Sequence, residues 1–397
     1  MEWRREITRE QWRTLVAAQL GWMLDAMDVM LYSFALKTIR GEFQLSGATA
    51  GALAALPLVT SAAGGMLFGW LSDRYGRARA LVWSIFAFSL LTAFTATAHS
   101  VGELVFWRTL VGIGLGGEWA AGSVLVAETW PERHRGKAIA LMQSAWAVGH
   151  LLAALLAAAI LPTWGWRPLF VVGVLPAVVA LWIRRGIREP AKWRQPSHTA
   201  GGAIAALFRV PLRRNVLMMA SLCSCLLFGY WGLFTWLPAY LASPVEKGGA
   251  GLSIALSSAW IVPMQIGAFC GYVSFGFLAD RFGRRRAFLT FVLTTAVLVP
   301  VYGLVGRNAA LLLALGPLVG YFGHGYFSAL GAMAADIFPA DLRTLAQGFC
   351  YNIGRGLAGL APVTVGALAD RNGIGAALAF TAVFFVAGAA VMARMER

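Results

Sequence analysis

The sequence predicts an all-α integral membrane protein whose twelve transmembrane helices form two pseudo-symmetric six-helix bundles. Three observations support this fold class. The 397 residues are 59% hydrophobic and only 13% charged, which is more apolar surface than a soluble protein of this size can bury. Long apolar runs recur along the whole chain. A twelve-residue phrase that stands between two such runs occurs twice.

Twelve apolar runs follow one another from Leu15 to the C-terminus, separated by short charged or Gly/Pro-containing breaks. A helix needs about 20 apolar residues to cross a bilayer, and each run has about this length. The runs are continuous, whereas the strands of a membrane barrel alternate polar and apolar residues over about ten positions. The predicted helices cover residues 14–38, 49–72, 79–98, 101–127, 136–160, 166–184, 214–242, 252–279, 286–305, 309–334, 343–369 and 373–393.

Positive charge is distributed unevenly over the segments between these helices. If the N-terminus lies inside, the cytoplasmic segments hold 25 Lys and Arg residues and the outer loops hold six. This asymmetry follows the positive-inside rule, so both termini are predicted to face the cytoplasm of a bacterial inner membrane. Topology then explains the net charge of +15, and no nucleic-acid partner is expected. The N-terminal segment is too charged and too acidic for a signal peptide.

The four cysteines, Cys223, Cys225, Cys270 and Cys350, all fall within apolar runs. On a helix, Cys223 and Cys225 would point to different faces, which does not suit a metal clip. The sequence therefore predicts small packing residues at these positions. No disulfide, metal or cofactor is expected.

The repeated phrase indicates a duplicated chain. GWLSDRYGRARA occupies residues 69–80, and GFLADRFGRRRA follows 207 positions later. A second pair, ETWPERHRG from residue 128 and DIFPADLRT from residue 336, matches at an offset of 208. Two anchors at almost one offset argue for two six-helix halves. The predicted domains are an N-terminal bundle over 1–184 and a C-terminal bundle over 214–397, joined by a basic, Pro- and Gly-containing cytoplasmic linker over 185–213.

Each phrase has the composition of a tight turn between two antiparallel helices. Gly76 and Gly283 allow backbone angles that other residues avoid. The neighbouring arginines hold the turn in the cytoplasm, and Asp73 or Asp280 can pair with an Arg or with a helix N-terminus.

The two G-x-L-x-D-R-x-G-R phrases resemble the loop 2–3 and loop 8–9 signature of the major facilitator superfamily, and the resemblance in helix number, halves and linker covers the whole chain. It implies a transporter in which two bundles rock around a central site. A gating role for Asp73 and Asp280 and a purely topological one are equally open. The positions assigned to gating or topology are Asp73, Arg74, Gly76, Arg77, Asp280, Arg281, Gly283, Arg284, Glu128, Arg135, Asp336 and Arg343.

Charged residues at membrane depth point to the transported species, because they cost several kcal/mol unless they line water or find partners. GWMLDAMDVMLYSFAL places Asp25 and Asp28 on one face of the first helix. FWRTLVGIGLGGEWAAG places Arg108 and Glu118 about 15 Å apart along the fourth helix. Arg108 can hold one carboxylate ionised, whereas a remaining acid, desolvated and near like charge, favours its protonated form. Such an acid can couple transport to protons, with Asp28 preferred, then Glu118, then Asp25.

The C-terminal half carries the opposite charge at this depth. His324 lies mid-span in GYFGHGYFSALG and Arg355 lies mid-span in FCYNIGRGLAGLAP, with no acid at comparable depth. A guanidinium that faces a central cavity can clamp a carboxylate with two donors. A structural ion pair of Arg355 with Asp25 or Glu118 is the alternative, and His324 could instead bond a backbone carbonyl.

Polar groups inside other spans complete the predicted cavity. Gln265 and Asn352 are favoured over aromatic candidates such as Trp146 and Tyr321, because Trp and Tyr are also common packing residues. The predicted substrate-binding residues are Arg108, Arg355, His324, Gln265, Asn352, Tyr32 and Gln143.

Further motifs narrow the resemblance. LDAMD, RTLVGIGLGGEW, ETWPERHRGKA, WGWRPLF and IREPAKW are similar to the corresponding segments of sialate:proton and metabolite:proton symporters, and aromatic-acid:proton symporters share much of this set. The resemblance implies proton-coupled symport of a small organic anion, such as a sialate, lactate or another metabolite acid. It supports functional roles for Asp25, Asp28, Arg108 and Glu118.

Three other functions are considered: an efflux antiporter, an integral-membrane enzyme, which is not expected, and a non-transporting sensor, for which the sequence shows nothing that resembles a soluble signalling domain. A drug or metabolite efflux antiporter of the same superfamily fits the 16 Trp and 24 Phe, although not the set of buried charges. An integral-membrane enzyme would need a nucleophile or a metal cluster, and the sequence contains no H-E-x-x-H, no Walker phrase and no G-x-S-x-G in a strand-turn-helix context. The expected partners are an organic acid, protons and lipid, and the expected state is a monomer.

Overall fold

The computed structural model describes residues 6–178, 207–209, 212–306, 308–339 and 342–395, and every regular element within these ranges is a helix. The first half contains α1 (Arg9–Glu42), α2 (Gly47–Tyr75), α3 (Arg77–Thr95), α4 (Val101–Thr129), α5 (Glu132–Trp164), α6 (Trp166–Val171) and the 3-10 turn η2 (Val172–Val174). The second half contains α9 (Leu212–Ala242), η4 (Val245–Lys247), α10 (Ile254–Ala259), α11 (Ile261–Phe282), α12 (Arg284–Leu304), α13 (Ala309–Gly325), α14 (Phe327–Ile337), α15 (Arg343–Ala358), α16 (Leu360–Asn372), α17 (Ile374–Phe380) and α18 (Ala382–Met395).

Each of the twelve predicted spans has a helical counterpart, so the prediction of an all-α membrane protein is confirmed. Nine helices in the described part of the chain are long and apolar enough to cross a membrane. Four spans of the second half are interrupted at one residue, namely Trp260, Tyr326, Gly359 and Thr381. These residues keep right-handed helical backbone angles, so the helices on either side continue as one rod. The predicted linker over 185–213 lies largely outside the described residues.

Local sequence signals explain where the helices begin. Thr8 caps α1 in a capping box, in which the Thr8 hydroxyl accepts from the Gln11 N–H at 3.2 Å and the Gln11 side chain accepts from the Thr8 N–H at 2.9 Å. Ser46 caps α2 through its hydroxyl alone, which accepts from the Thr49 N–H. In contrast, α3 and α12 start directly after Gly76 and Gly283, whose φ angles of 118° and 87° favour glycine. The repeated phrase therefore forms the same sharp turn twice.

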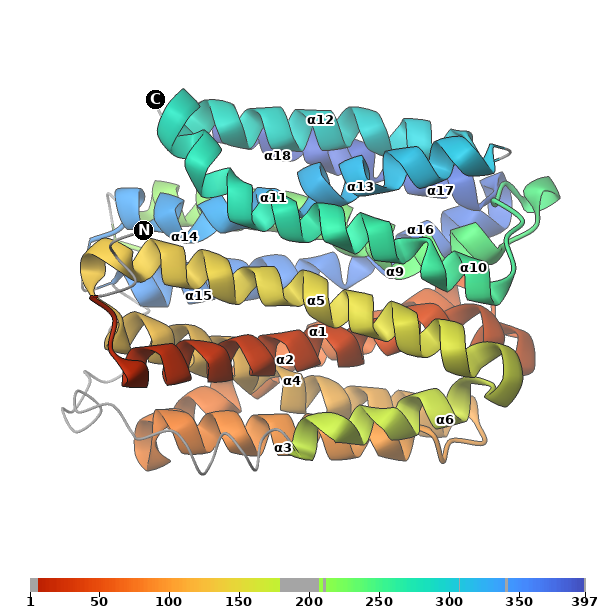
Figure 1. Cartoon of the computed structure of the whole chain (residues 1–397), viewed down its shortest axis with the longest axis horizontal. Helices are drawn as coiled ribbons and strands as arrows, with labels where there is room; N and C mark the ends of the chain where they lie inside the picture. The colour runs from red at the N-terminus through yellow and green to blue at the C-terminus, as the bar shows by residue number, and fades with distance from the viewer. Residues whose placement is uncertain (1–5, 179–206, 210–211, 307, 340–341, 396–397) are drawn as a thin grey trace.

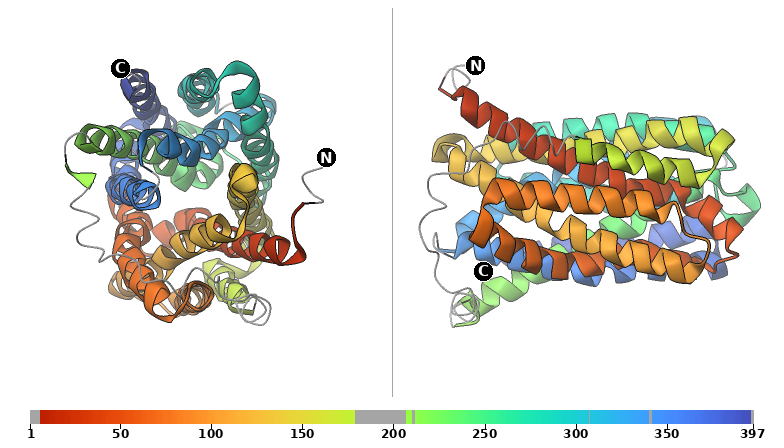
Figure 2. Two further views of the ribbon diagram at one scale, coloured as in Figure 1. Left: turned by 90° about the vertical axis from the view of Figure 1, so that its left-hand side faces the viewer. Right: turned by 90° about the horizontal axis from the view of Figure 1, so that it is seen from below.

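The helices form one elongated bundle with both termini at the same end (Figure 1 and Figure 2). In the first half α2 packs on α4, α1 on α5, and α3 on α4. In the second half α11 packs on α13, α9 on α15, and α12 on α18. The halves meet where α2 contacts α15 and α16, where α5 contacts α10 and α11, and where α1 contacts α9. The central site described below lies along this interface.

The two halves are tied together at the end of the bundle opposite the termini, which we call the distal end. Arg40 at the end of α1 forms an ion pair with Asp370 near the end of α16. The other carboxylate oxygen of Asp370 accepts a hydrogen bond from the Gly47 N–H at 2.6 Å. The Lys37 ammonium donates to the carbonyl of Ala242 at the end of α9. Three polar contacts therefore hold the distal end closed in this conformation.

The backbones of α2 and α16 also touch near this end. A Cβ atom placed on Gly366 would lie 2.1 Å from the Gly47 carbonyl oxygen and 2.6 Å from the ring of Trp236. Contacts of this length do not occur between real atoms, so only glycine allows the two helices to approach this closely.

Candidate functional site

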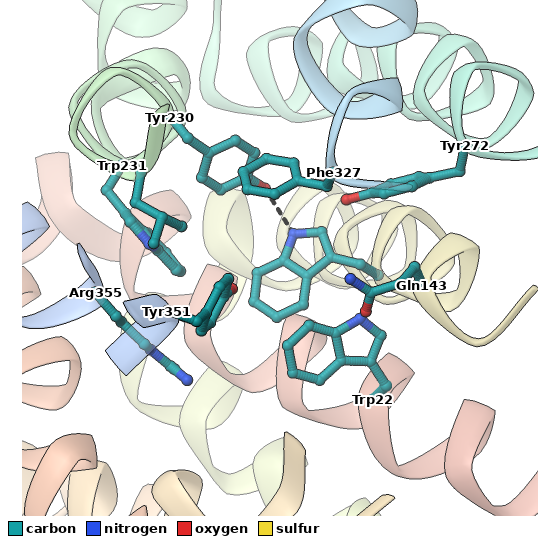
Figure 3. Close-up of a pocket in the computed structure, with 10 residues that line it drawn as sticks. Trp22, Gln143, Tyr230, Trp231, Tyr272, Phe327, Tyr351 and Arg355 are labelled. Atoms are coloured by element: carbon teal, nitrogen blue, oxygen red, sulfur yellow. Dashed lines mark hydrogen bonds between the residues drawn. The ribbon is translucent and has the colours of Figure 1, made fainter. Parts of the chain in front are cut away.

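A cavity lies between the two halves in the middle of the bundle. Its walls come from α1 and α5 on one side and from α9, α11, α14 and α15 on the other. The space between the lining side chains is about 350 Å³, part of it open to solvent. The lining residues are Trp22, Gln143, Trp146, Leu227, Tyr230, Trp231, Tyr272, Phe327, Tyr351 and Arg355 (Figure 3).

Aromatic rings make most of the wall and pack against one another. The rings of Trp22 and Trp146 lie 4.7 Å apart in a tilted arrangement. Trp146 and Trp231 meet edge to face at 6.0 Å, and Tyr230 meets Phe327 edge to face at 5.3 Å. Such contacts join side chains from four helices of both halves. The cavity is therefore built by the halves together and cannot be assigned to either one.

Arg355 is the one cationic side chain among the described lining residues. It is only 4% exposed, and its Nε and Nη2 atoms have no hydrogen-bond partner. Burying such a charge without a partner is costly. Arg355 therefore presents hydrogen-bond donors at the cavity that no protein group accepts from.

Asp25 on α1 is the acid that faces this charge. It is fully buried, neither of its carboxylate oxygens has a hydrogen-bond partner, and it interacts electrostatically with Arg355. The two side chains do not form an ion pair, although both are described. The structural ion pair considered from the sequence is thus not formed between Arg355 and Asp25.

Asp28 lies in a different environment, although it is only three residues away. Its Oδ2 atom accepts a hydrogen bond from the Thr92 hydroxyl of α3 at 2.6 Å. Its other oxygen faces the backbone of Gly173, where a Cβ atom would stand 3.1 Å from it. Arg108 and Asp25 are the charged groups that act on it electrostatically. Asp28 therefore packs between α1, α3 and η2 and does not line the cavity.

Arg108 on α4 contacts neighbours in the first half, although its Nη1 atom is buried without a hydrogen-bond partner. Its guanidinium lies 4.4 Å from the centre of the Tyr32 ring, a cation–π contact. Its Nε donates to the Leu53 carbonyl at 3.4 Å, while the Tyr32 hydroxyl donates to the Ala50 carbonyl at 3.1 Å. Neither side chain lines the cavity in this conformation. The sequence placed both among the substrate-binding residues.

A hydrogen-bond chain crosses from the first half to the second at the cavity wall. The Trp146 indole N–H donates to the Tyr230 hydroxyl at 2.6 Å. His324 Nδ1 lies 3.0 Å from the Gly320 carbonyl, which can only accept, so Nδ1 carries a proton. In the neutral ring the other nitrogen accepts, and the Tyr230 hydroxyl at 3.3 Å is placed to donate to it. His324 therefore bonds a backbone carbonyl, as the alternative from the sequence expected, and stands behind Tyr230 outside the lining.

The other predicted polar groups are placed as follows. Gln143 lines the cavity, and its Oε1 atom has no partner. Gln265 is buried with both side-chain polar atoms unpartnered, but it does not line the cavity. Asn352 is half-buried and also lies outside the lining. The Tyr321 hydroxyl is within hydrogen-bond distance of the Ser274 hydroxyl at 2.7 Å. The side chain of Glu118 lies outside the described residues.

The predicted gating positions lie in the turns at the end of the bundle that carries the termini. Arg74 contacts the rings of Trp70 and Tyr75 at 5.5 and 5.6 Å, and Arg281 lies 5.3 Å from the ring of Phe282. Asp280 and Arg284 are exposed, and Arg135 is half-buried. The side chains of five positions, Asp73, Arg77, Glu128, Asp336 and Arg343, lie outside the described residues.

Sequence reasoning missed most of the aromatic wall. Trp22, Tyr230, Trp231, Tyr272, Phe327 and Tyr351 were not singled out. A usable signal was the cluster of large aromatics around GYWGLF at 229–234, in the middle of a span and away from the interface belts where Trp and Tyr usually gather.

Comparison with known proteins identifies the family. The sequence pattern of the Major Facilitator Superfamily matches residues 20–274 and 247–396. A putative metabolite transport protein of Haemophilus influenzae is 36% identical, covering 94% of this chain and 93% of that protein. A cis,cis-muconate transport protein of Acinetobacter baylyi is 32% identical over 97% of this chain and 94% of its own. A sialic acid transporter of Escherichia coli is 28% identical with the same coverage of both chains, 97% and 94%.

A solved structure shows the same fold. A bacterial homologue of the human lysosomal transporter Spinster, in an inward-facing and unoccupied conformation, superposes with a TM-score of 0.78 at 18% identity and covers 98% of both chains. The likeness extends over the whole chain, so both halves follow the same arrangement of helices. With a family pattern across nearly all of the sequence and a relative 36% identical, the chain belongs to the major facilitator superfamily.

Proposed function

We propose that the chain is a secondary active transporter that moves a small organic acid together with protons by alternating access to the central cavity. The observation that carries this proposal is Arg355, a buried cation whose unpartnered donors line a cavity between the two halves. A guanidinium offers two parallel donors that match the oxygens of a carboxylate. Relatives named for muconate and for sialic acid support an organic acid as the substrate.

Charge balance explains how a proton would accompany the acid. With Asp25 ionised, its charge balances that of Arg355, with which it interacts, and an incoming carboxylate would leave one buried negative charge in excess. A proton on Asp25 removes this excess. Binding of the anion and of the proton therefore favour each other, which is the thermodynamic requirement for symport. This reasoning favours Asp25 over Asp28, because Asp28 is bonded to Thr92 away from the cavity.

The topology follows from the charge asymmetry of the sequence. Both termini are placed in the cytoplasm of a bacterial inner membrane, so the distal end faces outward. The contacts of Asp370 then close the outer side, and the cavity would open toward the cytoplasm in this conformation. The two rocking units are the bundles over 1–184 and 214–397, with the linker over 185–213 between them and the turns after α2 and α11 as gates. Because one chain supplies both walls of the cavity, a monomer suffices.

A proton-coupled aromatic-acid symporter and an efflux antiporter are the competing assignments, and the aromatic wall fits both. An efflux pump for neutral or cationic compounds has no use for an unpaired Arg355. We therefore prefer an acid as the cargo.

The test uses purified protein in proteoliposomes with radiolabelled carboxylates. We expect exchange of at least one acid, and accumulation when the outside is made more acidic. Arg355→Ala should weaken binding by roughly 30-fold or more, since removing one partner from a buried charged contact costs about 2–5 kcal/mol. Arg394→Ala, at an exposed position of α18, is the control and should bind normally. Transport of neutral or cationic compounds alone, or unchanged binding in Arg355→Ala, would contradict the proposal.

A further inference from the structure

Two buried polar side chains on the distal side of the cavity have no hydrogen-bond partner in the described part of the protein. His150 on α5 is fully buried, and neither of its ring nitrogens is bonded. Gln265 on α11 is 1% exposed, and neither its Nε2 nor its Oε1 atom is bonded. A neutral imidazole has one donor and one acceptor, and a side-chain amide has both kinds of group as well. Each side chain therefore leaves a donor and an acceptor unused in this conformation.

The two side chains lie at the same level of the bundle. His150 comes seven positions after Gln143 on α5, which runs toward the distal end (Figure 1). Gln265 comes seven positions before Tyr272 on α11, which runs away from that end. Seven positions are almost two helical turns, so each side chain lies on the face of its helix that carries a lining residue, about 10 Å nearer the distal end. Because α5 and α11 pack against each other, this level belongs to the interface between the halves.

Aromatic rings from both halves close around His150. The Phe34 ring of α1 lies 5.9 Å from the imidazole and the Phe234 ring of α9 lies 6.2 Å from it, both edge to face. Phe234 also lies 4.7 Å from the ring of Tyr230, which lines the cavity. These rings stand between the cavity and the distal end, so His150 becomes accessible from that end when the halves separate there.

No carboxylate of the described protein competes for the N–H of His150. The titratable group that acts on it electrostatically is His324 of the second half. Burying an unbonded donor or acceptor costs more free energy than burying an apolar group of the same shape. The unused groups of His150 and Gln265 therefore disfavour the closed distal end, and they favour a conformation in which water and cargo reach them.

We propose that His150 and Gln265 form an outer binding station, which binds the carboxylate of the cargo while the distal end is open and before Arg355 holds it. The imidazole N–H and the amide NH₂ are donors that suit an anion, and their acceptor atoms can bond the water that accompanies it. The two donors need not meet on one oxygen, because each lines the same level of the path from its own helix. This inference rests on the proposed function and adds a second site, about 10 Å from the cavity lining, to the route of the acid.

The first experiment measures how the two side chains affect the closed distal end of the empty protein. A cysteine introduced by Ala50→Cys, at a fully buried position, reports opening through its alkylation rate in a chain whose four native cysteines are replaced by alanine. His150→Phe and Gln265→Met keep similar side-chain sizes but remove the unbonded atoms. Each should slow alkylation about tenfold, the change expected for one buried unsatisfied group.

Two further variants serve as controls for this experiment. His150→Gln restores a donor and an acceptor, so it should react at nearly the wild-type rate. His324→Phe makes the same change at a buried histidine whose two nitrogens both have partners, and it should not slow alkylation. Melting temperatures of the purified variants identify any that fail to fold.

The second experiment asks whether the cargo occupies the station independently of the cavity. Phe34→Cys places a reporter beside His150, and Arg355→Ala removes the cation of the cavity from the same chain. The probe is whichever of cis,cis-muconate, N-acetylneuraminate and benzoate the wild type exchanges. At millimolar concentration it should still slow alkylation of the reporter about threefold or more, and adding His150→Phe should abolish this protection.

The possible failures are distinguishable. If the wild type exchanges no carboxylate, the proposed function is wrong and the station has no acid to bind. If carboxylates exchange but His150→Phe and Gln265→Met leave the alkylation rate unchanged or raise it, water inside the closed protein or packing alone accounts for both side chains, and the inference is overturned. If Arg355→Ala alone abolishes the protection at Phe34→Cys, the acid binds only in the cavity and the outer station does not exist.

Discussion

Replacing Asp25 with asparagine should separate anion binding from proton coupling. Asp25 is fully buried, has no hydrogen-bond partner for either oxygen, and interacts electrostatically with Arg355, although it is not itself a lining residue of the cavity. Asparagine has nearly the same volume but cannot become charged. The substitution therefore fixes the cavity in the charge state that an arriving carboxylate requires.

The size of the effect follows from linkage and from Coulomb's law. If one proton must bind for each anion, apparent affinity falls about tenfold per pH unit wherever Asp25 is ionised in the unloaded carrier, or about 100-fold over two units. The attraction between Asp25 and Arg355 sets an upper limit on this loss of affinity. The two side chains form no ion pair within 4.0 Å. At an effective dielectric constant of about 20, the energy of their attraction therefore stays below about 4 kcal/mol, which corresponds to less than about a thousandfold change in affinity.

The assay is substrate binding to purified protein over a series of pH values. Wild type should lose affinity as the pH rises, whereas Asp25→Asn should keep high affinity throughout and should exchange substrate without accumulating it on a pH gradient. Asp28→Asn is the matched control and should retain the pH dependence, because its carboxyl group is bonded to Thr92 and its cationic neighbour is Arg108, not Arg355. If Asp25→Asn keeps the slope and Asp28→Asn loses it, the charge-balance reasoning is refuted.

Three further predictions concern the contacts between the halves. Asp370→Asn removes the ion pair with Arg40 and weakens the hydrogen bond from the Gly47 N–H, which should destabilise the closed distal end by about 1–2 kcal/mol. Alkylation of a cysteine introduced by Ala50→Cys, at a position that is fully buried here, should then accelerate roughly five- to thirtyfold. An unchanged alkylation rate would contradict this role of Asp370. Gly366→Ala would place its Cβ 2.1 Å from the Gly47 carbonyl oxygen, so we expect faster alkylation at the same reporter or a lower melting temperature. The control is Gly356→Ala, whose Cβ would have nothing within 4 Å, and it should behave as wild type. Trp146→Phe removes the N–H that donates to the Tyr230 hydroxyl. The melting temperature of the empty protein should therefore fall, and that of the substrate-saturated protein should fall less. An equal fall in both melting temperatures would assign Trp146 to packing alone.

The helices could be predicted from the sequence because they follow from local properties. Apolar length defines a span, and glycine at positive φ defines the turn after α2 and after α11. Arg355 was also predictable as a cavity residue, since a lone cation at membrane depth needs water or an anion. Each of these arguments uses only neighbours in the sequence.

The rest of the site could not be predicted, because it depends on which face of each helix turns inward. Asp25 and Asp28 are three positions apart, and this offset of about 60° around the helix directs one toward Arg355 and the other toward Thr92. The aromatic wall was missed for a related reason. Within a uniformly apolar run, Trp22 and Trp231 look the same whether they face lipid, a neighbouring helix or the cavity. Only the packing of the halves decides between these surroundings.

The hydrogen bond between Trp146 and Tyr230 is relevant to how the unloaded transporter reorients in the proposed cycle. A symporter completes its cycle only if the unloaded protein can reorient, and in the empty cavity no substrate bridges the two halves. The indole and the phenol supply such a contact themselves, since one belongs to α5 and the other to α9. In the proposed cycle this hydrogen bond, together with the ring contact between Trp146 and Trp231, would hold the halves together while the cavity is empty, and its strength would contribute to the rate at which the unloaded protein reorients.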